Sequence, residues 1–219
     1  MYCSFYLKQV GHDDGIMNHL GGTSQTKDYI DSIWTHLQMN YCYLSLGSKI
    51  LVERLPNIKH YYGKNLKPDS ASLKSMRWNT QRDLNGANLM LYFGFVRAGR
   101  DFGGGKAYVG AVCQNGRDWR KQSINCYGYS HSKMGELLAH EIGHNLGMEH
   151  DFDEVHGGNG SSGSGGPCDG EGVMSYHGKK QWSQCSVNDF TAHYNKYKNN
   201  WCLSGMYNID IHTYIIPLA

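Results

Sequence analysis

The sequence predicts an α/β domain in which helices flank a mixed β-sheet. Segments with helical spacing of apolar residues alternate with strand-like segments along the 219 residues, the pattern expected when helices pack against a sheet. One strand-sized segment, 87–96, is almost continuously apolar, as is typical of a strand buried on both faces. The length is enough for one domain, or for one domain with two lobes, to bury its own core.

The first half of the chain contains four predicted elements. A strand rich in aromatic and apolar residues ends at Gly11, and a later strand is stopped by Pro56. A helix with Thr26 as its cap separates them, and Ser70 or Ser72 caps the helix that follows. The expected ranges are 2–10 for the first strand, 26–43 for the first helix, 48–55 for the second strand and 70–84 for the second helix.

The second half continues with three strands and two helices. The strand over 87–96 leads through a glycine-rich turn to a strand of alternating character. In the last helix, Ser186 and Asp189 have the spacing of a capping box, and the apolar residues form one stripe. The remaining expected ranges are 106–113 and 124–129 for strands, a helix that starts at Ser132, and 186–198 for the last helix.

The most informative segment reads H-E-x-x-H-x-x-G-x-x-H-D. His140 and His144 are four residues apart and lie on one face of a helix, where both can bind one metal ion. Glu141 is placed to reach a water on that ion. Gly147 can adopt the positive φ that ends the helix and brings His150 toward the other two. Three histidines with an open fourth position are typical of a catalytic zinc ion. The alternative interpretation of the motif is a surface helix that is rich in His and Glu by chance.

This motif resembles that of the metzincin zinc endopeptidases, in which a Met-turn follows downstream. An Asp directly after the third histidine, here Asp151, resembles the motif of the adamalysin or reprolysin branch. This branch includes snake-venom metalloproteinases and ADAM catalytic domains. Met174 stands at the matching Met-turn, where the family has an apolar floor beneath the histidines that does not bind metal; an ordinary core methionine is the alternative. The likeness extends to three further segments, 87–92, 110–113 and 182–186.

The resemblance implies a metzincin fold, with a twisted, mostly parallel five-stranded sheet, an antiparallel edge strand, flanking helices and a smaller C-terminal subdomain after the zinc helix. The catalytic domain would occupy 1–205, with an upper subdomain over 1–147 and a lower one over 148–205, and 206–219 would form a tail. The edge strand over 106–113 would bind an extended protein or peptide substrate as an additional strand. An ordinary edge strand would have the same residues.

Seven cysteines are more than a reduced cytosolic enzyme usually carries and indicate an oxidising compartment. The resemblance implies two disulfides, Cys113–Cys202 and Cys168–Cys185. The pairing of the other three stays open, because connectivity cannot be derived from sequence alone. These three are Cys3, Cys42 and Cys126, of which the first two are one candidate pair. An odd number leaves at least one thiol free or paired with another chain.

Charge and hydropathy argue against several other classes of protein. A net charge of +2 gives no reason to expect nucleic acid or an anionic membrane as a partner. No apolar run approaches the ~18 residues of a membrane-spanning helix. Together with the cysteines, this favours a secreted or extracellular protein. No signal peptide or propeptide is visible, although proteins of this resemblance are made with both, and further domains after Ala219 stay open.

A segment rich in glycine and serine, 157–172, separates the zinc motif from the Met-turn. Its composition predicts a surface loop. The loop is either a variable insertion without a role or a flap that adjusts access to a cleft. Asn159 begins an N-glycosylation sequon in this loop.

The expected cofactor is one catalytic zinc ion. Part of the family also has a structural calcium site, but the matching positions fit it poorly. Asn85 stands where an Asp is expected, and no Asn follows Cys202 in Leu203, Ser204 and Gly205. Calcium is therefore doubtful.

These features predict a zinc-dependent endopeptidase that hydrolyses internal peptide bonds of proteins. Glu141 would be the general base toward the zinc-bound water that attacks the scissile carbonyl, and would then pass the proton to the leaving amine. A catalytically silent protein-binding module with the same fold is the alternative. Inactive relatives lose Glu141 or a ligand histidine, and this chain keeps all four. The protein substrate and the preferred residue after the scissile bond cannot be read from the sequence.

Overall fold

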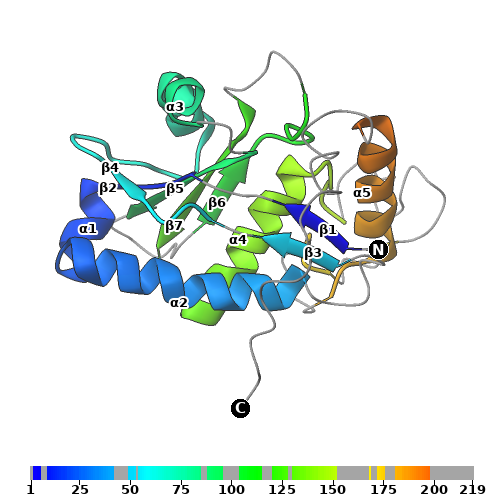
Figure 1. Ribbon diagram of the computed structural model, residues 1–219, viewed down its shortest axis with the longest axis horizontal. Helices are drawn as coiled ribbons and strands as arrows, with labels where there is room; N and C mark the ends of the chain where they lie inside the picture. Colours follow the sequence, from blue (N-terminus) through cyan, green and yellow to red (C-terminus); the bar gives the residue numbers. More distant parts are fainter. Residues whose placement is uncertain are drawn as a thin grey trace, which may run out of the picture.

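A five-stranded sheet forms the centre of the computed structural model, with helices on both sides of it (Figure 1). The helices are α1 (Asp14–Leu20), α2 (Thr23–Tyr41), α3 (Ser70–Asp83), α4 (His131–Asn145) and α5 (Gln184–Tyr197). The structure describes residues 2–5, 9–41, 49–52, 54–84, 88–95, 104–114, 120–127, 130–151, 168, 172–175 and 181–197. No helix in these ranges is both long and apolar enough to cross a membrane.

The central sheet has the strand order β4-β2-β5-β7-β6. The pairs β4–β2, β2–β5 and β5–β7 are parallel, and β6 pairs with β7 in the antiparallel direction at the edge. The predicted fold class, a mostly parallel sheet with an antiparallel edge strand and flanking helices, is confirmed. The strands are β2 (Gln9–Asp13), β4 (Ile58–Tyr61), β5 (Met90–Phe95), β6 (Gly104–Ala107) and β7 (Gln122–Tyr127).

Strand β5 is buried on both faces, as its continuous apolar sequence predicts. Leu91 and Phe93 belong to the core cluster shared with α2 and α4, whereas Met90 and Tyr92 pack in the cluster beneath α3. All four side chains are fully buried. Burial of each large apolar side chain contributes about 1.5–3 kcal/mol. Because its side chains enter both clusters, β5 joins the two layers of the core.

The N-terminal strand differs from the prediction of one strand over 2–10. The chain forms two strands there, because β1 (Tyr2–Phe5) pairs with β3 (Lys49–Val52) in a separate two-stranded parallel sheet, while β2 enters the central sheet. Gly11 lies inside β2 and does not end it; a Cβ at Gly11 would lie 2.2 Å from Cε2 of Tyr61. The close approach of the Tyr61 ring explains the glycine. Strand β4, which follows Pro56, was not predicted.

The edge strand β6 is shorter than the expected range of 106–113, and that prediction was wrong. Residues beyond Ala107 turn away from the sheet, with positive φ at Gly110 (62°) and Cys113 (64°). Left-handed conformations cannot continue a β-ladder. The backbone N–H groups of Gly110 and Val112 instead donate to the carbonyls of His144 and Asn145, at 2.7 and 3.0 Å. The segment after β6 is therefore tied to the end of α4.

The caps of two helices differ from the sequence expectation. Asp69, not Ser70 or Ser72, caps α3, because its carboxylate accepts from the N–H of Ser72 at 2.7 Å. Asp13 caps α1, which was not predicted, by accepting from the N–H of Ile16 at 2.9 Å. Carboxylates at such positions satisfy an otherwise unpaired N–H group of the first turn.

The predicted capping box of α5 is absent. The Ser183 hydroxyl, not that of Ser186, accepts from the first turn, namely from the Ser186 N–H at 3.0 Å. Asp189 accepts from the Glu149 N–H at 3.1 Å and so binds the segment that follows the zinc motif. The spacing of Ser186 and Asp189 was correct for a capping box, but a tertiary contact uses the carboxylate.

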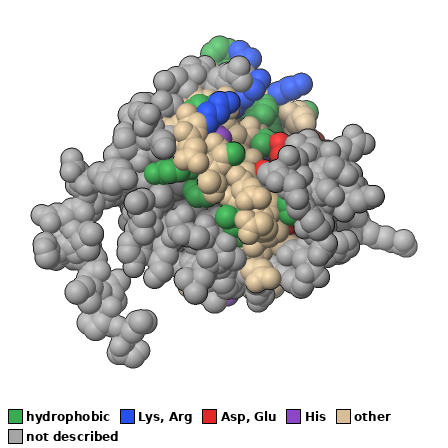
Figure 2. Space-filling model, turned by 90° about the vertical axis from the view of Figure 1, so that its right-hand side faces the viewer, with side chains coloured by type: hydrophobic (Ala, Val, Ile, Leu, Met, Phe, Trp, Pro, Cys, Tyr) green, Lys and Arg blue, Asp and Glu red, His purple; other side chains and the backbone are tan. Residues whose placement is uncertain are grey.

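Figure 2 shows one face of the molecule, with Lys and Arg side chains along the upper rim and Asp and Glu side chains apart from them. Among the described residues on this face, histidine reaches the surface only as small patches. Among the described residues on this face, basic and acidic side chains therefore lie in separate regions.

Candidate metal centre

Helix α4 presents His140 and His144 on one side, one helical turn apart. Both are 7% exposed, so α4 is buried along its length around them. Helix α2 packs closely against α4, because Gly135 has no side chain; a Cβ there would lie 2.5 Å from Cβ of His36. This packing fixes the position of α4 in the core.

The chain turns back immediately after α4. Gly147 has a φ of 96°, as predicted, and its N–H donates to the His144 carbonyl at 2.9 Å. The Met148 N–H donates to the Gly143 carbonyl at 3.0 Å. Such bonds satisfy carbonyls that a helix end leaves unpaired. The turn brings His150 to the face of α4 that carries the other two histidines.

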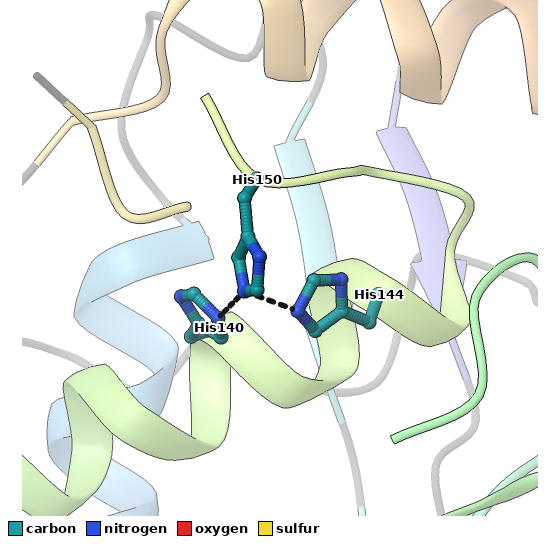
Figure 3. Close-up of side chains that lie close together, drawn as sticks. All are labelled: His140, His144 and His150. Carbon is teal, nitrogen blue, oxygen red and sulfur yellow. Dashed lines mark hydrogen bonds between the residues drawn. The ribbon is translucent and has the colours of Figure 1, made fainter. Parts of the chain in front are cut away.

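The three imidazoles converge through their Nε2 atoms (Figure 3). Nε2 of His150 lies 3.0 Å from Nε2 of His144 and 3.2 Å from Nε2 of His140. The Nδ1 atoms face outward: Nδ1 of His140 lies 2.8 Å from the carbonyl of Val173, and Nδ1 of His144 lies 2.8 Å from the carbonyl of Met148. A carbonyl can only accept, so these two Nδ1 atoms carry the protons. Their Nε2 lone pairs therefore point into the centre.

The donor set fits a zinc ion. With Zn–N distances of about 2.0–2.1 Å, neighbouring nitrogens of a tetrahedral site lie about 3.3 Å apart, close to the two distances from His150, and all three ligand atoms lie within 4.8 Å of one another. Lone pairs at such distances repel each other unless a cation or proton lies between them. Burial is the main cause that lowers the pKa of His144 to about 3, followed by the charges of His140 and His150. The imidazole is therefore in the neutral form that binds metal at physiological pH.

Glu141 supplies the acidic group of the centre. Its side chain is buried, and Oε2 has no hydrogen-bond partner among the described residues. Burial raises the pKa of Glu141 to about 8, against the opposing effect of the Lys106 charge. A buried carboxylate without a partner is costly, so its retention next to the histidines indicates a site that binds a cation or a water.

The segment around Met174 lies beneath the histidines. Met174 is fully buried, and a Cβ at Gly143, between the two histidines of α4, would lie 2.6 Å from its Sδ atom. Residues 172–175 form a tight turn, closed by the Ser175 N–H bond to the Gly172 carbonyl at 3.0 Å. The sulfur therefore packs against the α4 backbone, at the position expected for a Met-turn.

Comparison with known proteins agrees with this geometry. Residues 61–201 match Metallo-peptidase family M12B Reprolysin-like. The chain belongs to this metallopeptidase family. Members of the family use zinc, so the three-histidine group is the zinc-binding site of a zinc metalloendopeptidase domain.

Two curated relatives of the reprolysin-like domain come from Gloydius brevicauda, the zinc metalloproteinase-disintegrin-like brevilysins H2a and H2b. Each is 33% identical over 111 residues, which cover 49% of this chain and 24% of the relative. The chain thus matches about a quarter of the length of these relatives.

Two solved structures resemble the reprolysin-like domain at low sequence identity. One is a chain of a chaperone–substrate complex, with 15% identity, 83% of this chain and 32% of that chain covered, and a TM-score of 0.56. The other is metalloproteinase-II from Bacteroides fragilis, with 17% identity, 87% and 53% covered, and a TM-score of 0.49. At such identities, likeness to a solved structure concerns the fold alone.

Asp151 holds the segment after the zinc motif of the reprolysin-like domain in place. The side chain is fully buried, and its Oδ1 atom accepts from the hydroxyls of Ser183 at 2.5 Å and Ser186 at 3.4 Å. Its N–H donates to the carbonyl of Met174 at 3.3 Å. This burial excludes a solvated acid at the position, and Asp151 anchors the turn to the start of α5.

The cysteines of the reprolysin-like domain are described in part. Cys168 and Cys185 form a disulfide, as the resemblance implied. Cys113 is disulfide-bonded, but its predicted partner Cys202 lies outside the described residues. Cys42 and the side chain of Cys3, the other candidate pair, also lie outside them. Cys126 is a free and buried thiol, and burial raises its pKa.

Several predicted features of the reprolysin-like domain lie outside the described residues. They include the glycosylation candidate Asn159, the glycine-rich segment apart from residues 168 and 172, and the two candidate calcium positions. Sequence reasoning missed Gly105, although a Cβ there would lie 2.2 Å from Oε1 of Glu141. The run of three glycines from 103 to 105 was the available signal, but it was interpreted only as a turn.

Proposed function

We propose that this domain is an active zinc endopeptidase whose zinc is held by the Nε2 atoms of His140, His144 and His150. The observation that carries the proposal is the convergence of these three atoms beside the buried carboxylate of Glu141. Three protein ligands leave a fourth position for water, which is the arrangement of a catalytic zinc. The buried turn at Met174 supports this arrangement from below.

The chain's own residues divide the chemistry between them. Zinc, when bound, acidifies a water and polarises the scissile carbonyl. Glu141 takes the proton of the attacking water at its carboxylate and passes it to the departing amine nitrogen. Burial favours a proton on this carboxylate, because it disfavours the charged form. The carbonyls of Val173 and Met148 hold two of the imidazoles in the ligand tautomer.

Strand β6 is the proposed binding edge for substrate. In the described sheet it is the last strand and pairs only with β7, which leaves its other edge for an extended peptide. Residues Gly104–Ala107 are the candidate contacts, in place of the longer range that the sequence suggested. Gly105 places this edge directly beside Glu141. Proteins or peptides in extended conformation are therefore the proposed substrates.

We further propose that the domain acts outside the cytosol as part of a longer protein. The Cys168–Cys185 disulfide supports an oxidising compartment. The brevilysin relatives are much longer than the matched region, which supports additional domains. Within the chain, the proposed division is an upper subdomain over 1–147, a lower one over 148–205 and a tail over 206–219.

Cleavage of a mixed peptide library by the zinc-loaded protein tests the proposed function. Matched samples are the Glu141→Ala variant and wild type treated with a chelator, with zinc then restored. We expect cuts in wild type and in the zinc-restored sample only, and their pattern identifies the preferred residue after the scissile bond. No cuts from folded protein with one bound zinc would favour the protein-binding module.

A further inference from the structure

Gly105 lies so close to the Glu141 side chain that no residue with a Cβ would fit at this position. A Cβ built on Gly105 would lie 2.2 Å from Oε1, 2.4 Å from Cδ and 2.4 Å from Cγ of Glu141. Real Cβ atoms essentially never approach other atoms within 3.0 Å. The φ of Gly105 is outside the left-handed region, so lack of space, and not backbone conformation, requires glycine at this position.

Rotation of the carboxylate alone cannot relieve this contact. The Cγ atom is involved as well as the carboxylate, so the whole Glu141 side chain would have to move. Glu141 is 4% exposed and lies in the buried C-terminal half of α4, which is fixed by the core. Close-packed interiors transmit such strain to neighbouring groups instead of absorbing it.

The pleat of β6 gives this contact a direction. Adjacent residues of a strand point to opposite faces, and Gly105 faces Glu141, whereas a Cβ at Gly104 would meet Pro68 at 3.2 Å. The strand pairs with β7 through Gly105 opposite Asn125. The edge proposed to bind substrate and the proposed general base therefore approach each other so closely at one glycine that a Cβ has no room between them.

We propose that Gly105 is a positioning residue, which fixes the Glu141 carboxylate between the metal centre and the substrate edge. This inference rests on the proposed function for its catalytic consequence, but the contact itself does not. Gly105 acts through Glu141, so its replacement is expected to lower kcat more than it changes KM. A misplacement of about 1 Å in a catalytic group costs on the order of 10²-fold in rate.

The first test compares Gly105→Ala with Gly11→Ala. Gly11 is a matched control, because it is also a strand glycine whose Cβ would lie 2.2 Å from a buried side chain, that of Tyr61, away from the metal centre. We expect Gly105→Ala to keep one zinc per chain and to lose on the order of 10²-fold in kcat, with KM within about threefold. We expect the folded Gly11→Ala protein to keep its kcat within about twofold.

The second test needs no activity and uses the metal-free protein. Gly105→Ala is expected to lower the melting temperature by roughly 3–8 °C in the wild-type background. In the Glu141→Ala background the same substitution should lower it by less than about 2 °C, because the clashing atoms are gone. As the control, Gly11→Ala should lower the melting temperature by the same amount in the wild-type background and in the Glu141→Ala background.

The proposal is overturned if Gly105→Ala keeps the wild-type kcat, or if its melting-temperature loss is the same with and without the Glu141 side chain. Equal kcat losses in Gly105→Ala and Gly11→Ala would also contradict it, since general loosening would then explain both. A wild type that cleaves nothing would contradict the proposed function, whereas the melting-temperature comparison would still decide the contact.

Discussion

Gly147 ends the zinc helix with a φ of 96°, and a Cβ at this position would lie 2.8 Å from Cβ of His193 on α5. The glycine therefore meets two requirements at once, a left-handed backbone and the close approach of α5. The first can be recognised in the sequence, because glycine precedes the third histidine of the motif. The second depends on a residue 46 positions later and cannot be recognised there. The need for glycine at position 143 likewise depends on a distant residue, because its missing side chain makes room for Met174.

Substitution of Gly147 by Ala should reduce both stability and zinc affinity. We expect a loss of about 1–3 kcal/mol in the free energy of unfolding from strain and overpacking, and weaker zinc binding because His150 is displaced. Urea unfolding and competition with a zinc chelator measure the two effects. Gly21→Ala is the control, because Gly21 has a φ of 95° but open space around it. Zinc affinity as weak in Gly21→Ala as in Gly147→Ala would refute this account.

Asp83 provides a residue-scale prediction on pH. Its carboxylate accepts from Arg82 and from the Tyr61 hydroxyl and lies 3.1 Å from Nζ of Lys59. The hydrogen bond from Arg82 is the main cause that holds its pKa well below the usual range, against the effect of burial. A lowered folded-state pKa stabilises the protein above the unfolded-state value of about 3.9, and this contribution is lost as pH falls below it.

Asp83→Asn should therefore cost about 1.5–3 kcal/mol at pH 7, the usual contribution of hydrogen bonds to a charged group. The variant should also lose less stability than wild type between pH 4 and pH 2. Urea unfolding across this range measures both. Parallel acid-induced losses in the two proteins would show that Asp83 is not the responsible group.

At the scale of elements, the disulfide and Asp151 connect α5 to the metal centre from two directions. Cys185 lies in the first turn of α5, and Asp151 accepts from the serines at its start. The two cysteines of the disulfide, Cys168 and Cys185, are 17 positions apart in the sequence. Helix α5 is thus fixed to the segment after the zinc motif by both covalent and polar contacts.

Replacement of Cys168 and Cys185 by serine is expected to lower the free energy of unfolding by about 3 kcal/mol, as estimated for a loop of this length. The zinc ligands lie elsewhere, so one zinc per chain should remain bound in the folded variant. Calorimetry and metal analysis measure these quantities. A variant as stable as wild type would contradict a stabilising role of the disulfide.

The elements that were predicted correctly are those defined by local pattern. The helix of the zinc motif and the helix over residues 184–197 carry a helical pattern, and the buried strand β5 carries a continuous apolar run. The errors concern pairing between distant segments. Residues 2–10 look like one strand, but they divide between two sheets, and β6 ends early because the chain turns to bond with α4. Neither event has a local signal.

At the scale of the whole molecule, the metal centre joins three parts of the chain. Two ligands lie on α4, the third follows the Gly147 turn, and the carbonyl of Val173 binds an imidazole from the Met174 segment. Zinc binding should therefore stabilise the whole fold. A three-histidine site could be predicted from the sequence because all ligands lie within 11 residues, whereas the supporting carbonyl could not.

Removal of zinc should lower the stability of the entire domain. At free zinc 1,000-fold above Kd, binding to the native state contributes about 4 kcal/mol to the free energy of unfolding. We expect the melting temperature to fall on chelation, to recover when zinc is restored and to rise with zinc concentration. His144→Ala should melt at one temperature with or without zinc. A wild-type melting temperature that does not respond to zinc would contradict a folded-state zinc site.

The central claim is that the histidines hold zinc while Glu141 moves the proton, and one paired measurement tests it most directly. Zinc content and kcat are determined on the same preparation of Glu141→Gln, with wild type and His144→Ala alongside. We predict one zinc per chain and a loss of about 10³-fold or more in kcat for Glu141→Gln, and loss of zinc for His144→Ala. A Glu141→Gln protein that keeps wild-type turnover, or that loses its zinc, would contradict the division of roles.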